Sequence, residues 1–390
     1  MLLVAAVLAS AGCAAAKVPA AGTGGSPPVV SAVTPAPGAP GTIGRGARIA
    51  VFPVQNVSGN AASSREVTED LKKSLAARTV SLQDDPPLDR FLEKRRVRFT
   101  GGLTRELGGA FRSELGVDAV LIVSLDLYEA AAPPKIGITA RLVSTGEETA
   151  ILWADGTFLS GNGSPGLLGL GLVTDPGVLK ARALDAIAGS LEGYLAGRKK
   201  APRGGDAPEA GGGPGYRSKH LPRGLYRQPD VRMIPGQNPV KVAVLPFLDR
   251  SARPYAGELM ANHFLRELVR WSSVEVVEPG VVRLALLRSR LIMEGGLSFP
   301  QADLLGELLG VDYVVTGEVM DYQDPQGYEG TPYAEFSVYV IDVKRRQVVW
   351  MSSSYNRGDD RVVLFDWGKT YTAGAMVSEM VRAVTDRFLR

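Results

Sequence analysis

The chain alternates between short continuous apolar runs and stretches in which apolar residues recur every three or four positions. Continuous runs of about four to eight apolar residues indicate strands buried on both faces, whereas the longer period indicates helices with one apolar side. The run at 49–54, for example, is followed by Val67, Leu71 and Leu75, which mark an amphipathic helix. The pattern therefore predicts an α/β fold.

A tetrapeptide, Leu-Gly-Val-Asp, occurs at 115–118 and again at 309–312. In both places it ends an apolar helix pattern and precedes a β-branched strand pattern, and the glycine is well placed to stop the helix. Because the motif recurs with the same neighbours, we interpret Asp118 and Asp312 as residues that the fold requires, and we place neither in a functional site.

The surroundings of the tetrapeptide repeat in the same order. The apolar run at 48–54 matches the run at 241–247, and Trp153 matches Trp350 downstream. Matching order over such a length indicates a duplicated unit. We therefore predict an α/β fold made of two tandem copies of a mixed β-sheet domain flanked by helices. The two copies are predicted at 46–197 and 240–390.

Each copy is predicted to contain helices, then a strand meander, then a closing helix. In the first copy we expect helices near 67–75, 88–92, 103–115 and 184–195, with strands at 49–54, 119–127, 136–144 and 149–158 and an extended segment at 97–99. In the second copy we expect helices at 255–271, 281–292, 298–309 and 376–388, with strands at 240–247, 274–277, 313–320, 335–343 and 347–355.

The N-terminus has the pattern of an export signal. An apolar run at 2–11 ends in small residues and is followed by Gly12 and Cys13. This run is too short to cross a membrane as a helix but has the length of a signal-peptide core. Small residues before a cysteine resemble the lipobox of bacterial lipoproteins, so we predict a signal peptide at 1–12 and lipid attachment at Cys13. An ordinary secretory signal cleaved among the alanines is the alternative.

Two segments lack the apolar content of a folded domain. Residues 13–45 are rich in Ala, Pro, Gly and Ser/Thr, which predicts a disordered tether behind the lipid anchor. Residues 198–239 form a Gly/Pro-rich linker, and the part at 198–232 holds nine Lys/Arg and three Asp/Glu, a balance of 9 − 3 = +6. The whole chain has a formal charge of only +3, so composition does not point to nucleic acid.

No set of reactive side chains converges in the sequence. Of the two histidines, His220 lies in the linker and His263 is expected on the flank of an amphipathic helix. The single cysteine excludes an intramolecular disulfide and a multi-cysteine metal site. We therefore predict no catalytic residue, no metal site and no cofactor, and expect that the protein is not an enzyme.

Two segments are candidate interaction surfaces. The uncharged glycine-spaced loop at 166–173 carries Leu167, Leu168, Leu170 and Leu172, which would contact a partner or a membrane if exposed, or belong to the core if buried. The long hairpin connection in the second copy carries Tyr322, Tyr328 and Tyr333. Tyrosine favours interfaces because it combines apolar area with a hydrogen-bonding tip, although packing of the rings on the loop's own base explains the pattern equally well.

The second copy also resembles a known group of bacterial envelope lipoproteins. The resemblance is carried by A-V-L-P-F at 243–247, L-G-V-D-Y-V-V-T-G-E-V at 309–319 and V-V-W at 348–350, and is fainter in the first copy. The group includes the curli-secretion channel lipoprotein, the lipoprotein activators of penicillin-binding proteins and domains similar to the amino-terminal domain of the Tol-system propeller protein. The resemblance implies protein–protein contact in the periplasm and no cofactor.

The leading hypothesis is an exported, lipid-anchored periplasmic binding or assembly module acting through protein–protein contacts. We expect it on the periplasmic side of the outer membrane, with envelope proteins as partners, no nucleic acid and a possible homo-oligomer. A subunit of an oligomeric outer-membrane secretion apparatus is one alternative. An envelope enzyme acting on glycan or peptide is an alternative of another class.

Overall fold

The computed structural model describes residues 30–33, 43–163, 171–198, 220–229, 239–291, 293, 296–360, 362 and 369–389. The predicted signal peptide and Cys13 lie outside the described residues, as does most of the predicted tether and linker. Two α/β units follow one another, each with a mixed sheet and flanking helices, which confirms the predicted fold class.

The first unit has four helices in its described part. The helices are α1 (Ser64–Ala76), α2 (Asp85–Lys94), α3 (Arg105–Leu115) and α4 (Pro176–Leu195). The strands of its sheet are β1 (Val30–Val33), β2 (Ile49–Val51), β3 (Gln55–Asn56), β4 (Ala119–Glu129), β5 (Lys135–Ser144) and β6 (Ile151–Ser160). The extended segment predicted at 97–99 forms no strand.

The second unit repeats this order. Its helices are α5 (Ala256–Leu268), α6 (Pro279–Arg288), α7 (Phe299–Leu309) and α8 (Ala373–Leu389). Its strands are β7 (Arg223–Arg227), β8 (Val240–Val244), β9 (Leu248–Asp249), β10 (Val274–Val276), β11 (Tyr313–Gln323), β12 (Tyr333–Asp342) and β13 (Gln347–Arg357). A capping box begins α7, with Ser298 and Gln301 capping each other.

The two sheets share one topology, except that the edge strand β10 of the second has only an isolated bridge between Ile49 and Leu82 as its counterpart in the first. In the first, the strand order is β1-β6-β5-β4-β2, and in the second it is β10-β8-β11-β12-β13-β7. The three long strands of each unit form an antiparallel meander, while β2 and β8 run parallel to β4 and β11. A bulge falls at the same point of each meander, after Leu125 and after Val319. The duplication thus extends to the strand register.

The Leu-Gly-Val-Asp motif performs the same structural task in both units. Gly116 and Gly310 each end a helix with φ of 64°, a left-handed conformation that glycine adopts without steric cost. The Asp118 carboxylate accepts a hydrogen bond from the backbone N–H of Arg48 at 2.8 Å. Asp312 accepts the equivalent bond from Lys241 at 3.0 Å. The aspartate therefore ties the start of the long strand to the start of its parallel neighbour.

Each sheet has an edge strand that the sequence did not predict. The predicted disordered tether contains β1, which pairs antiparallel with β6, so that part of the tether prediction is wrong. The predicted linker contains β7, which pairs antiparallel with β13. Both strands come before their unit in sequence and cross it to reach the last strand of the meander. Both strands lie in Pro- and Gly-rich sequence, which gives no strand pattern. An edge strand tolerates such sequence because it pairs with a neighbour on one side only.

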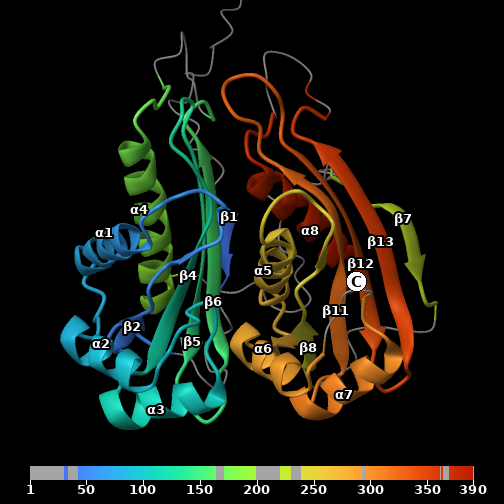
Figure 1. Ribbon diagram of the computed structural model, residues 1–390, viewed down its shortest axis with the longest axis horizontal. Helices are drawn as coiled ribbons and strands as arrows, with labels where there is room; N and C mark the ends of the chain where they lie inside the picture. The colour runs from blue at the N-terminus through green and yellow to red at the C-terminus, as the bar shows by residue number, and fades with distance from the viewer. Residues whose placement is uncertain are drawn as a thin grey trace, which may run out of the picture.

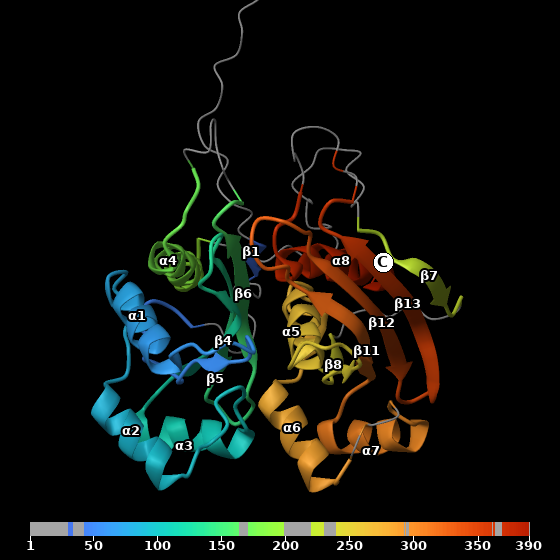
Figure 2. The same ribbon diagram turned by 45° about the horizontal axis from the view of Figure 1, so that its top comes forward.

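The molecule is built in four layers (Figure 1). The outer helices α1 and α4 cover one face of the first sheet, and α5 with α8 lies between the first sheet and the second. The shorter helices α2, α3, α6 and α7 lie together at one end of the molecule (Figure 2). None of the helices in the described ranges is long and apolar enough to cross a membrane.

Candidate interaction surface

One face of the first sheet is closed by the second unit. Val120, Ile122 and Ala154 on this face belong to the same apolar cluster as Met260 and Met376 of the second unit. Close approach depends on small residues at the contact. A Cβ atom at Gly156 would lie 2.2 Å from the Arg266 guanidinium, and one at Gly374 would lie 2.2 Å from the Phe158 ring. The helices α5 and α8 are therefore seated directly on the first sheet.

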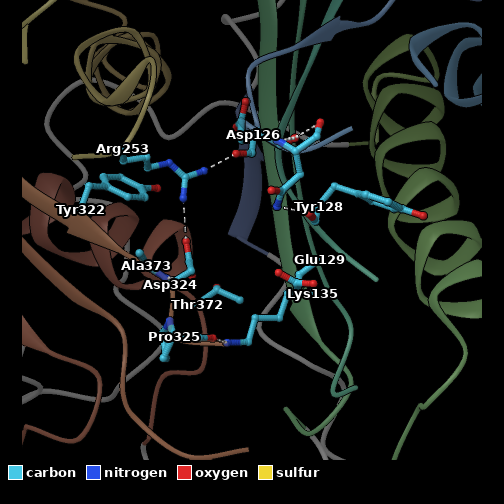
Figure 3. Close-up of polar contacts among 12 residues, drawn as sticks. Asp126, Tyr128, Glu129, Lys135, Arg253, Tyr322, Asp324, Pro325, Thr372 and Ala373 are labelled. Carbon is cyan, nitrogen blue, oxygen red and sulfur yellow. Dashed lines mark hydrogen bonds and ion pairs between the residues drawn. The ribbon is translucent and has the colours of Figure 1, made fainter. Parts of the chain in front are cut away.

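Polar groups connect the two units along this junction (Figure 3). Arg253, in the loop before α5, donates to the backbone carbonyl of Asp126 in the first unit and to Asp324 at 3.1 Å. Its guanidinium lies over the Tyr322 ring, 4.8 Å from the ring centre. Lys135 of the first unit donates to the carbonyl of Pro325. These contacts join the far end of β4 and β5 to the end of β11.

His263 and Arg266 lie in the middle of the junction. The His263 ring stacks on Phe158 of the first unit with ring centres 5.3 Å apart, and its Nδ1 lies 3.2 Å from the Ser378 hydroxyl. Arg266 donates to the same hydroxyl at 2.6 Å. Burial holds the pKa of His263 well below its ordinary value, and the nearby Arg266 and Arg253 lower it further. The expectation that His263 lies on a helix flank is wrong, because α5 is covered on both sides.

A buried ion pair ties the two units near α6. Arg141 of β5 donates to both carboxylate oxygens of Glu278, at 3.0 and 3.1 Å. Glu278 is 0% exposed, caps α6, and accepts a further bond from the backbone N–H of Leu103 at 2.9 Å. A bidentate pair with its remaining acceptor sites filled is the arrangement that offsets burial of charge. This pair holds three segments together across the junction.

The carboxyl group of Asp126 lies inside the junction, where the side chain is 2% exposed. Burial raises its pKa from an ordinary value of 3.8 to about 6, and hydrogen bonds with Ser124 and Thr139 oppose the rise only in part. The folded chain therefore holds this proton at pH values where the unfolded chain has lost it. Stability from this group is fully present below the unfolded pKa and falls as pH rises toward 6.

Replacing Asp126 with asparagine should remove this pH dependence. At pH 7.5 the variant should be more stable than the parent by about 1–3 kcal/mol, because a charged group no longer has to be buried. Near pH 4, where the carboxyl is protonated in the folded chain and only about half ionised in the unfolded chain, the gain should be much smaller. Urea unfolding of both proteins at the two pH values measures this. A gain that is the same at both would contradict the assignment.

In the described part of the chain, no helix covers the corresponding face of the second sheet. Register places Tyr226, Met351 and Tyr339 side by side on β7, β13 and β12. Met351 is 44% exposed and Tyr226 is 44% exposed. We name as the open sheet face the solvent-facing side of β7, β11, β12 and β13, which carries Arg223, Tyr226, Met320, Tyr339, Met351 and Tyr355, together with the polar residues Glu318, Glu335 and Ser337. Tyrosine, methionine and arginine are the residue types enriched where proteins bind one another.

The strand register also shows which covered residues of the first unit are equivalent to residues of the open sheet face. Met351 occupies the position of Ala154, because each follows directly after the single tryptophan of its strand, Trp350 or Trp153, and Tyr355 occupies that of Phe158. In the first unit these positions pack beneath α5 and α8. The second unit presents the same face of the same sheet without such a cover in the described part of the chain. This face is therefore the candidate interaction surface.

The predicted leucine loop is described only in part. Leu167, Leu168 and Leu170 lie outside the described residues, whereas Leu172 is 41% exposed. The structure gives no contact between Leu172 and the open sheet face.

The three predicted tyrosines do not form one surface. Tyr322 is buried in the junction beneath Arg253, so its assignment to an interaction surface is wrong. Tyr328 is exposed in the β11–β12 connection, and Tyr333 packs edge-on against Tyr355 with ring centres 5.1 Å apart. Tyr333 thus borders the open sheet face. Alternation along β12, with Tyr333, Glu335, Ser337 and Tyr339 on one side, is the sequence signal that identifies this face.

The described part of the chain contains no group of three or more His, Cys, Asp or Glu side chains arranged to hold a metal ion. His220, which was predicted in the linker, is buried, with its Nε2 3.1 Å from a carboxylate oxygen of Glu379 on α8. The two histidines therefore belong to different packing environments.

No protein-family model and no curated protein matches this sequence. Among solved structures, the chain is similar to a PelC dodecamer from Paraburkholderia phytofirmans, with 18% identity and a TM-score of 0.26 over 41% of this chain and 96% of that one. It is similar to the lipoprotein GNA1162 from Neisseria meningitidis, with 17% identity and a TM-score of 0.27 over 37% and 99%. It is also similar to the C-terminal domain of LpoB from Salmonella enterica, with 15% identity and a TM-score of 0.24 over 31% and 85%. Likenesses of this size leave the function to be argued from the chain itself.

Proposed function

We propose that this chain is an exported binding or assembly module of the bacterial cell envelope, anchored by lipidation of Cys13. The first unit and the buried junction form a rigid support, and the open sheet face of the second unit contacts a partner protein. The observation that carries this proposal is the exposure of Met320, Met351 and Tyr226 on a sheet face whose counterpart in the first unit is covered.

The covered counterpart indicates what kind of partner fits. In the first unit, the equivalent face of the sheet is covered by α5 and α8, which bring small and apolar residues to the strands. An exposed sheet face with Met and Tyr side chains can accept a helix pair in the same way, because long unbranched and aromatic side chains adapt to the ridges of a helix. We therefore propose that the open sheet face binds a helical element of another protein.

The α1 and α4 layer of a second copy of this chain fits this face poorly. On the outer side of this layer, Lys180 pairs with Asp70 at 2.9 Å and Arg78 pairs with Asp185 at 2.5 Å. Asp185 is 63% exposed, so docking this layer on a sheet would move solvated charges into an apolar contact. For a module that binds another protein we expect the full chain to be monomeric on its own in light scattering, whereas a ring-forming subunit would be larger.

Site-specific photocrosslinking tests the contact. With p-benzoylphenylalanine in place of Met351, ultraviolet light should join the chain to one defined envelope protein in intact cells. The matched control replaces Val178, which is 43% exposed on the opposite, ion-paired side of the molecule. The control position should give no such adduct. Equal adducts from both positions, or none from Met351, would contradict the proposal.

The anchor is tested separately. Incorporation of a labelled fatty acid should be lost in Cys13→Ser, because the thiol is the only acceptor at the predicted cleavage site. Unchanged labelling would exclude lipidation at this cysteine while leaving the contact at the open sheet face to be judged by crosslinking.

A further inference from the structure

A groove lies at the junction between the two units. Two adjoining cavities of about 360 and 140 Å³ share Phe99, Arg283 and Leu287 in their walls. One wall is the loop before α3 in the first unit, and the other is α6 with part of α5 in the second. Sites for small groups occur preferentially at such boundaries between folded units. Neither the junction network nor the open sheet face includes this groove.

The smaller cavity is apolar with a few polar groups. Its walls include Leu265, Val282 and Leu286, and an apolar cavity of about 150 Å³ accommodates a benzene-sized group. The cavity therefore has room for one side chain of the size of Leu or Phe. Leu287 at the rim is 60% exposed, which extends the apolar surface to solvent.

Hydrogen-bonding groups in the same cavity suit a peptide better than a hydrocarbon chain. Gln55 and Asn262 bring side-chain amides, and Glu258 brings a carboxyl group to its wall. Burial raises the pKa of Glu258, with Arg283 opposing the rise. Amides and a carboxyl group can pair with backbone N–H and C=O groups, whereas an alkyl chain would leave them without partners.

The larger cavity is basic. Arg95, Arg98 and Arg283 face it, with Glu106 as the acidic group of its lining. Arg95 pairs with Glu114, and Arg283 stacks over the Phe99 ring at 4.3 Å. Arg98 is exposed and makes no hydrogen bond or ion pair with the rest of the described chain. Within the described part of the chain, Arg98 and Arg283 form no ion pair, and two such guanidinium groups beside an apolar cavity complement acidic side chains of a ligand.

We infer that this groove binds a short acidic peptide segment of another protein, with one apolar side chain inserted in the smaller cavity. The acidic residues beside that anchor contact Arg98 and Arg283, and the peptide backbone bonds to Gln55, Asn262 and Glu258. The groove is thus a second binding site, which is separate from the open sheet face and does not depend on what that face binds.

Fluorescence anisotropy with the full chain tests this inference. The probe is a labelled Asp-Glu-Leu-Phe-Asp-Glu peptide, and its matched controls carry Gly-Gly for Leu-Phe or lysines for the acidic residues. The probe should bind at least about tenfold more tightly than either control, and raised salt should weaken it. Equal binding of the Gly-Gly control would show attraction by charge alone and overturn the inference, as would no binding of the probe.

Variants locate the binding within the groove. Arg98→Glu should weaken the probe by about tenfold or more, whereas Arg90→Glu, at an exposed arginine outside the groove, should have little effect. Ala261→Phe fills the smaller cavity and should abolish binding; Leu287→Asp serves as the second test if that variant fails to fold. Identical behaviour of Arg98→Glu and Arg90→Glu would contradict the inference. Tighter binding of decanoate than of the peptide would assign the groove to acyl chains instead and would also overturn it.

Discussion

Replacing Glu278 with alanine should lower the free energy of unfolding by about 3–5 kcal/mol, the range for removing one partner of a buried ion pair. The variant leaves the Arg141 guanidinium, whose residue is 7% exposed, without its carboxylate. It also removes the acceptor for the Leu103 N–H and the cap of α6. Chemical denaturation followed by circular dichroism measures the loss.

The chain supplies a matched control for this variant. Glu106 and Arg288 form another ion pair between the two units at 2.9 Å, but their side chains are 60% and 66% exposed. Glu106→Ala should therefore cost no more than about 1 kcal/mol. If Glu278→Ala lowers the free energy of unfolding as little as Glu106→Ala, water reaches Arg141. Such a result would contradict the buried position of this ion pair in the junction.

Gly280→Ala should destabilise the protein by about 1–3 kcal/mol, although alanine normally favours a helix. A Cβ atom at this position of α6 would lie 2.4 Å from the backbone nitrogen of Leu103 and 2.7 Å from the carbonyl carbon of Gly102. Backbone atoms cannot rotate away as a flexible side chain can, so the two units must separate slightly. Thermal unfolding, with hydrogen exchange at the junction, measures the effect.

Gly109→Ala in α3 is the control for the helix preference itself. A Cβ atom there would meet nothing within 4 Å, and the position is exposed. This substitution should be neutral or stabilising by up to about 1 kcal/mol. A stabilising effect of Gly280→Ala equal to that of Gly109→Ala would mean that α6 is not held against the first unit.

Much of each unit could be predicted from the sequence because its signals are local. Continuous apolar runs predicted the central strands, and spacing of four residues predicted α1, where Val67, Leu71 and Leu75 are all buried. The repeated Leu-Gly-Val-Asp predicted equivalent helix ends and strand starts, and the paired hydrogen bonds of Asp118 and Asp312 explain why both copies keep it.

The junction could not be predicted in the same way. Arg266 and Glu267 of α5, with Arg270 just after the helix, have the spacing of a solvated side in sequence. All three are nevertheless buried, because they pair with one another and with neighbouring helices. Which helix layer closes which sheet depends on contacts between residues more than a hundred positions apart. Apolar residues of α5 lie on more than one side of the helix between Leu259 and Leu268, and this was the signal in the sequence for burial on both sides.

The open sheet face could not be found from the sequence for a related reason. Tyr322 and Tyr328 are close in sequence, but the strand carries Tyr322 into the junction while the loop leaves Tyr328 in solvent. The residues of the open sheet face come from four strands, so only the register brings Tyr226, Tyr339 and Met351 together. Sequence proximity was therefore a poor guide to this surface.

The affinity of the partner captured at position 351 for purified variants tests the central claim most directly. Met351→Glu places a charge in the centre of the open sheet face and should weaken binding at least about tenfold, because a buried unpaired charge opposes an apolar contact. Val178→Glu adds the same charge on α4 and should leave the affinity within about twofold of the parent. Equal affinities for the two variants would show that the partner binds elsewhere and would contradict the assignment of the open sheet face.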